Sequence, residues 1–145
     1  MVKKKVEQRS NFNFFLTIPT RWMDNDVYGH VNNVIYYSYF DTAINTYLIN
    51  EGGLRINSDQ IIGVCAESGC QYNSPISFPE VVDAGLSVDL ISNKSVKYEI
   101  ALFTNKSNSA AAQGWFFHVF VNRINMTPTN IPSTIKTSLE KLVKI

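Results

Sequence analysis

Residues 24–33, DNDVYGHVNN, gather two carboxylates, one histidine, one glycine and three asparagines into ten positions. Carboxylates and imidazoles are the usual acids, bases and metal ligands of proteins, and asparagines both donate and accept hydrogen bonds. The stretch lies directly before the apolar run VIYYSYF. A metal loop, a catalytic turn and an ordinary helix cap could each use such residues, and the spacing separates the first from the other two.

A metal-binding loop is excluded by this spacing. Asp24, Asp26 and Gly29 match the first half of an EF-hand calcium loop. However, the fifth position is Tyr28, and the twelfth is Ile35 in place of the bidentate glutamate. The two histidines of the chain lie far apart and neither cysteine has a close partner, which argues against zinc. We therefore expect no metal site.

A catalytic turn remains possible if a helix begins near Asn32 or Asn33. The first backbone N–H groups of a helix lack partners and carry partial positive charge, so they can stabilise an oxyanion. An upstream carboxylate can attack the same carbonyl or activate water, and Gly29 lets a substrate approach the backbone closely. Alternatively, Asp24 and Asp26 are turn residues and Asn32 is a cap. The residues alone leave both interpretations open.

The element that would hold this turn is a helix over residues 34–50, VIYYSYFDTAINTYLIN. Its aromatic and β-branched start would also suit a strand, but about 17 residues is long for a strand. Two glycines, Gly52 and Gly53, provide a stop. Apolar residues recur at helical spacing, at Tyr36, Phe40, Ala43 and Tyr47. The segment is apolar on most sides, which predicts a helix buried in the domain.

Five strands are expected beside this helix. Before the loop, apolar residues alternate from Phe12 to Ile18 and stop at Pro19. After the helix, four alternating segments cover residues 62–72, 82–90, 96–102 and 115–121. In the last of these, we expect the apolar face to be Trp115, Phe117, Val119 and Val121, and we give His118 no role.

Short turns between the consecutive strands predict an antiparallel sheet, and a short amphipathic helix is expected from Ser133. The predicted fold is therefore α+β, with an antiparallel sheet against one long central helix. A length of 145 residues suggests a single domain spanning residues 1–145.

The composition excludes several other classes of protein. The net charge of +1 provides no basic field for nucleic acid. No apolar run is long enough for a membrane-spanning helix, and the start of the chain is not a convincing signal peptide. Cys65 and Cys70 are five residues apart, so on one regular strand they would lie on opposite faces and could not bridge. Free thiols predict a cytoplasmic protein.

The segment RWMDNDVYGHVNNVIYYSYFDTA resembles the signature of the 4-hydroxybenzoyl-CoA thioesterase family, which has the hotdog fold. The family pattern is close to D-x-D-x-x-G-H-V-N-N-x-x-Y. It is matched here by Asp24, Asp26, Gly29, His30, Val31, Asn32, Asn33 and Tyr36. The segments QYNSP and SNKSVKYEIAL are similar to two further strands of the family. The resemblance implies hydrolysis of an acyl-CoA thioester by a sheet wrapped around a long helix.

The resemblance also assigns catalytic positions. Asp26 stands at the catalytic carboxylate, as nucleophile or general base, and the N–H near Asn33 stands at the oxyanion position. His30 either holds the loop or contacts substrate. A related group, the acyl-ACP thioesterases, has a functional histidine at this place but an asparagine two residues earlier. This chain has Tyr28 there, so the machinery of that group is not transferred.

The expected substrate-binding residues are Gly29, Tyr36, Lys94 and Ser95, with the last two near the phosphates of CoA. No metal or redox cofactor is implied. The family pairs its protomers, so we expect a homodimer or homotetramer in which one helix start faces residues 67–72 of the partner. Two alternatives remain, namely an acyl-ACP thioesterase and a catalytically silent domain that binds acyl thioesters.

Overall fold

The computed structural model describes residues 2–144. This range contains five strands, two α-helices and two short 3-10 turns. In chain order they are η1 (Arg9–Asn11), β1 (Phe14–Pro19), η2 (Trp22–Asp24), α1 (Ile35–Asn50), β2 (Ile61–Tyr72), β3 (Val81–Ile91), β4 (Ser95–Thr104), β5 (Ala112–Asn122) and α2 (Ser133–Glu140). None of the helices in the described range has the length and apolar character needed to cross a membrane.

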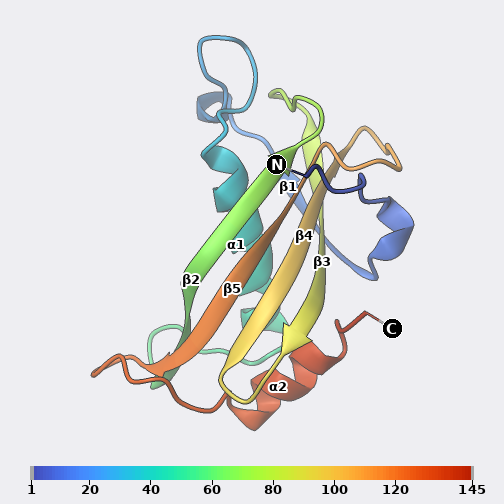
Figure 1. The fold of residues 1–145 in the computed structure, drawn as a ribbon. Coiled ribbons are helices and arrows are strands. Elements are labelled where there is room, and N and C mark those ends of the chain that lie inside the picture. The colour runs from blue at the N-terminus through green and yellow to red at the C-terminus, as the bar shows by residue number, and fades with distance from the viewer. Residues whose placement is uncertain (1, 145) are drawn as a thin grey trace.

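The strands form one antiparallel sheet in the order β1-β3-β4-β5-β2. The helix α1 lies along one face of this sheet, and α2 lies beside the end where β3 turns into β4 (Figure 1). The buried residues of α1 are Tyr36, Tyr39, Phe40, Ala43, Ile44, Tyr47 and Leu48. They join the inward side chains of the sheet in the main hydrophobic core. The predicted α+β arrangement of one long helix against an antiparallel sheet is confirmed.

The two ends of α1 agree with the prediction to within one residue, but its cap does not. The helix begins at Ile35, the N-cap position is Val34, and no side chain caps it. The expected asparagine cap is therefore wrong, and Asn32 instead stabilises the preceding turn by accepting the Val34 N–H at 3.2 Å. At the other end, Gly53 has a φ of +72°, a left-handed conformation that favours glycine and confirms the predicted stop.

The buried face of β5 is the opposite of the predicted one. Phe116, His118 and Phe120 are buried, and the ring of Phe116 lies 6.2 Å from that of Phe40 in α1. The predicted face, which begins with Trp115, lies on the other side of the sheet. Apolar residues occupy both faces of β5, so alternation alone could not select one. Pairing with β4 decides, because residues directly opposite each other share a face.

An irregularity in β2 overturns the prediction for the two cysteines. The register against β5 shifts between Cys65 and Glu67. Cys65 lies opposite His118 and Cys70 lies opposite Gly114, two residues on the same face of β5. The thiols therefore share a face, because a bulge reverses the alternation beyond it. Both cysteines are free.

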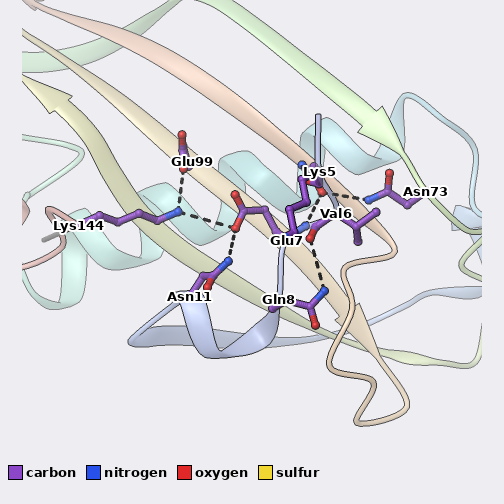
Figure 2. Close-up of polar contacts among 9 residues, drawn as sticks. Lys5, Val6, Glu7, Gln8, Asn11, Asn73, Glu99 and Lys144 are labelled. Carbon is purple, nitrogen blue, oxygen red and sulfur yellow. Dashed lines mark hydrogen bonds and ion pairs between the residues drawn. The ribbon is translucent and has the colours of Figure 1, made fainter. Parts of the chain in front are cut away.

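The N-terminal arm, residues 3–12, lies on the face of the sheet that α1 leaves uncovered. The backbone N–H of Glu7 donates to Gln113 Oε1 at 2.9 Å, and Asn11 Nδ2 donates to Glu7 Oε2 at 2.7 Å. Lys144 Nζ reaches both Glu99, at 2.9 Å, and Glu7, at 3.9 Å (Figure 2). This network ties the arm, the sheet and the C-terminal tail together.

Candidate active site

The loop of residues 24–33 is closed by its own backbone. The N–H of Asp26 donates to the carbonyl of His30 at 2.9 Å, and the N–H of Gly29 donates to the carbonyl of Asp26 at 3.1 Å. Gly29 has a φ of +85°, which explains why glycine occurs at this turn. The loop is fixed to the segment after β2 because the Val31 N–H donates to the Ile76 carbonyl at 2.7 Å.

The carboxylate of Asp26 is half-buried, and only one of its oxygens is engaged. Its Oδ1 accepts the backbone N–H of Tyr28 at 2.9 Å, which holds the loop in an Asx turn. In the described part of the chain, its Oδ2 has no hydrogen-bond partner. This oxygen is available to a ligand.

Asp24 is in a very different environment, although it is only two residues away. It is fully buried, and Tyr39 Oη donates to its Oδ2 at 2.7 Å. The backbone and the guanidinium of Arg21 also donate to it. Burial alone would raise the pKa of Asp24, but these hydrogen bonds outweigh burial and hold the pKa below its ordinary value. Asp24 is therefore a structural carboxylate that anchors the loop to α1.

The turn that leads into α1 leaves one backbone donor free. The N–H of Ile35 donates to the carbonyl of Asn32 at 2.9 Å, and the Asn32 N–H donates to the carbonyl of Asp24 at 2.9 Å. The Asn33 N–H makes no hydrogen bond within residues 2–144. The Asn33 carbonyl, by contrast, accepts the hydroxyl of Tyr72 at 2.7 Å.

These groups line a solvent-accessible cavity of about 500 Å³. Its lining residues are Asp26, Tyr28, His30, Val31, Asn33, Tyr36, Tyr72, Asn73, Ser74 and Pro75. The structure therefore brings together four of the seven predicted site residues. A fifth, Gly29, lies in the same loop without lining the cavity.

The two sides of the cavity differ in character. The backbone carbonyl of His30 accepts the N–H of Asp26. The exposed imidazole of His30 lines the cavity and makes no hydrogen bond within residues 2–144. The phenol ring of Tyr36 is buried and packs edge-on against Tyr72, with ring centroids 4.8 Å apart. Burial raises the pKa of Tyr36, so the phenol stays neutral at ordinary pH. The cavity thus has a polar loop side and an aromatic side.

Tyr72 was not among the predicted site residues. Its signal in the sequence was the segment QYNSP, which resembles a family strand. Residues 67–72 were expected to face the helix start of the partner, and Tyr72 was given no role within its own protomer. In the structure, the last residue of β2 reaches across to a helix start 39 residues earlier in the chain. Only the folded structure reveals this contact.

Lys94 and Ser95 lie far from the cavity within one protomer. Lys94 lies in the turn between β3 and β4, and Ser95 is the first residue of β4. This turn is at the end of the sheet opposite the loop of residues 24–33 (Figure 1). The side chain of Lys94 is exposed and forms no ion pair within residues 2–144. The hydroxyl of Ser95 lies 2.7 Å from that of Ser92. A role for this turn at the same cavity requires a second copy of the chain.

Two other cavities, of about 400 and 510 Å³, lie against the N-terminal arm. Glu7 lines both of them, but its carboxylate is already bound to Asn11 and Lys144. None of the predicted site residues lines either cavity. The cavity at Asp26 is therefore the better candidate for chemistry.

Comparison with known proteins identifies the family. Residues 20–139 match the Thioesterase-like superfamily. This chain belongs to that superfamily. The structure of the PA5185 protein from Pseudomonas aeruginosa strain PAO1 matches it with a TM-score of 0.95 at 46% identity, over 97% of this chain and 98% of that chain.

Two further similarities are more distant. The structure of DHNA-CoA thioesterase from Staphylococcus aureus has a TM-score of 0.73 at 20% identity, over 80% of this chain and 78% of that chain. The uncharacterized protein YsmA of Bacillus subtilis (strain 168) is 29% identical over 66 residues, which are 46% of this chain and 44% of that protein. The match thus spans less than half the length of YsmA.

Membership of the superfamily confirms the hotdog fold and supports a thioester hydrolase. It is broader than the 4-hydroxybenzoyl-CoA thioesterase family that the motif resembles. The superfamily gives the class of reaction, whereas the substrate and the catalytic residues are the subject of the proposal below.

Proposed function

We propose that this chain hydrolyses an acyl-CoA thioester to a free acid and CoA, as a member of the 4-hydroxybenzoyl-CoA thioesterase family. One observation carries the proposal. The free oxygen of Asp26 and the unpaired N–H of Asn33 belong to residues that line the same open cavity. An acyl carbonyl placed there would meet a carboxylate on one side and a hydrogen-bond donor on the other.

In the simpler mechanism, Asp26 is a general base. It takes a proton from water, and the resulting hydroxide adds to the thioester carbonyl carbon. The Asn33 N–H donates to the oxyanion of the tetrahedral intermediate. When this intermediate collapses, the C–S bond breaks and the CoA thiolate leaves. The proton held by Asp26 passes to the thiolate through solvent, which restores the carboxylate. A thiolate leaves readily, so no strong general acid is needed.

In the second mechanism, Asp26 is a nucleophile. Its free oxygen adds to the carbonyl carbon, the thiolate leaves, and a mixed anhydride forms that water then cleaves. Single-turnover hydrolysis in ¹⁸O water followed by peptide mass spectrometry tests for the anhydride. Label in the Asp26 carboxylate requires it, whereas label confined to the acid product excludes only an anhydride that water cleaves at the Asp26 carbonyl.

The aromatic side of the cavity suits the acyl group. The rings of Tyr36 and Tyr72 and the side chain of Pro75 offer an apolar wall beside the reacting carbonyl. Tyr36 contacts the acyl group in this proposal. His30 and Gly29 frame the polar side, where the imidazole contacts substrate.

A dimer completes the site. Residues 65–68 of β2 are exposed, and β2 is an edge strand of the sheet. Edge strands are normally paired or covered. Two-fold pairing along β2 runs the two copies antiparallel. If the two-fold axis passes near residues 69–70, the helix start of one protomer, which lies beside its own Tyr72, faces residues 67–72 of the other. This pairing also brings Lys94 of the partner subunit and Ser95 of the partner subunit to the same end of the joined sheet as Asp26, where the CoA phosphates are expected.

A hydrolysis panel with a thiol-reactive dye tests the proposal, using aryl- and alkyl-CoA thioesters and matched acyl-ACP substrates. Turnover of CoA thioesters supports it. Turnover of acyl-ACP alone favours an acyl-ACP thioesterase, and binding without turnover favours a silent domain. Light scattering at the assay concentration tests the assembly, since a fully active monomer would contradict the shared site. We propose further that residues 1–145 form one domain and that the protein is cytoplasmic.

A further inference from the structure

A single hydrogen bond connects the sheet to the turn that leads into α1. Tyr72, the last residue of β2, donates its hydroxyl to the carbonyl of Asn33 at 2.7 Å. Burial raises the pKa of the Tyr72 phenol, so the hydroxyl remains protonated and able to donate at ordinary pH. The ring of Tyr72 is held independently by its edge-on contact with Tyr36.

The other hydrogen bonds of this turn come from Asn32, whose N–H donates to the carbonyl of Asp24 in η2. Asn32 accepts the N–H of Ile35 through its carbonyl and the N–H of Val34 through its side chain. Neither bond involves Asn33 itself. Among residues 2–144, Tyr72 provides the one hydrogen bond that any strand makes to the turn of residues 32–35. Asn33 is exposed, and its carbonyl accepts no other hydrogen bond within residues 2–144 than that of Tyr72.

The geometry points to Tyr72 as a positioning residue for the proposed oxyanion donor, the N–H of Asn33. This inference rests on the proposed function. By holding the Asn33 carbonyl, the hydroxyl fixes the residue whose N–H must meet the developing oxyanion. It also satisfies a carbonyl oxygen whose partial negative charge would otherwise oppose the oxyanion.

The test is Tyr72→Phe, which removes the hydroxyl and keeps the ring. The matched control is Tyr37→Phe, because Tyr37 lies on α1 outside the cavity lining and its hydroxyl makes no hydrogen bond in the described chain. We expect Tyr72→Phe to lower kcat about tenfold, which corresponds to about 1.4 kcal/mol of transition-state stabilisation. KM and the unfolding midpoint should change little, and the control should behave as wild type.

Hydrogen exchange gives a readout that does not depend on activity. In Tyr72→Phe, the amides of Val34 and Ile35 should exchange several-fold faster, because the turn loses its bond to β2. An unchanged kcat or unchanged exchange would overturn the inference. A raised KM with an unchanged kcat would also overturn it, because the hydroxyl would then contact substrate. If the wild-type chain hydrolyses no thioester, the proposed function fails, and the exchange data show separately whether Tyr72 holds the turn.

Discussion

The N-terminal arm and the loop of residues 24–33 are both polar segments of the same molecule, but they differ in whether their polar groups are paired with one another. At the arm, Lys144 of the C-terminal tail pairs with both Glu7 of the arm and Glu99 of β4 (Figure 2). In the loop, one oxygen of Asp26 and the N–H of Asn33 have no partner within residues 2–144, and both residues line a cavity. Polar groups that satisfy each other hold the fold together, whereas polar groups left unpaired at a cavity can bind a substrate.

The same contrast occurs within the loop itself. Asp24 and Asp26 are two residues apart, but Asp24 accepts hydrogen bonds from Tyr39 and Arg21 in the interior. Asp26 accepts a single bond from its own loop. The first carboxylate should therefore affect stability and the second should affect catalysis.

The largest expected effect is that of Asp26→Asn. An asparagine oxygen can still accept the Tyr28 N–H, so the loop and the unfolding midpoint should be preserved. Hydrolysis of every active thioester should fall by about three orders of magnitude in kcat, with little change in KM, because the carboxylate acts on the transition state. Steady-state kinetics measure this, with Glu140→Gln, an exposed carboxylate on α2, as the control. A wild-type rate in Asp26→Asn would contradict the proposed mechanism.

The next effect is on stability, in Asp24→Asn. The amide cannot accept all the donors that surround the buried carboxylate, so the free energy of unfolding should fall by about 3 kcal/mol. Asp24 has a lowered pKa, so its contribution is present above its ordinary pKa near 3.8 and is lost as the pH falls below that value. Urea unfolding measures the change. Asp59→Asn is the matched control, because Asp59 pairs with Arg55 at the surface, and equal losses in both variants would refute the distinction.

His118 extends the comparison to an unpaired group in the core. Its Nδ1 is buried and has no hydrogen-bond partner among residues 2–144, and burial lowers the pKa of His118 from 6.5 to about 4. Between these values the unfolded chain binds a proton that the folded chain excludes, so stability falls as the pH is lowered. This histidine should lower the free energy of unfolding by about 2 kcal/mol between pH 7 and pH 5. Unfolding of His118→Phe at both values should show a smaller loss than wild type, and an identical pH dependence would contradict the assignment.

The smallest expected effects are those of substitutions at two lysines, Lys144 and Lys94. Lys144→Met breaks the partly exposed ion pairs of the arm and should lower the free energy of unfolding by less than about 1 kcal/mol, with no change in KM. Lys94→Met should leave stability unchanged and raise KM for CoA thioesters about three- to fivefold at low ionic strength. An unchanged KM for Lys94→Met would remove this lysine from the CoA site.

Much of the fold could be predicted from local sequence patterns. The helix over residues 34–50 was predicted within one residue of α1, because its spacing and its terminal glycines are local signals. Which face of β5 is buried could not be predicted from the sequence, because both faces carry apolar residues and pairing with β4 selects between them. The faces of the two cysteines were predicted wrongly because a bulge in β2 leaves no local signature in an alternating pattern.

The sequence by itself determined the order and spacing of the chemical groups in the loop, namely Asp26, Gly29, His30 and Asn33. A turn directly before a helix brings residues at these spacings close together. Only the tertiary structure decided which of two neighbouring aspartates is buried, and that Tyr72 reaches Asn33, 39 residues earlier in the chain. Turn and helix preferences depend on a few adjacent residues. Burial and long-range hydrogen bonds depend on which segments pack together, and that is settled only when the whole sheet closes on α1.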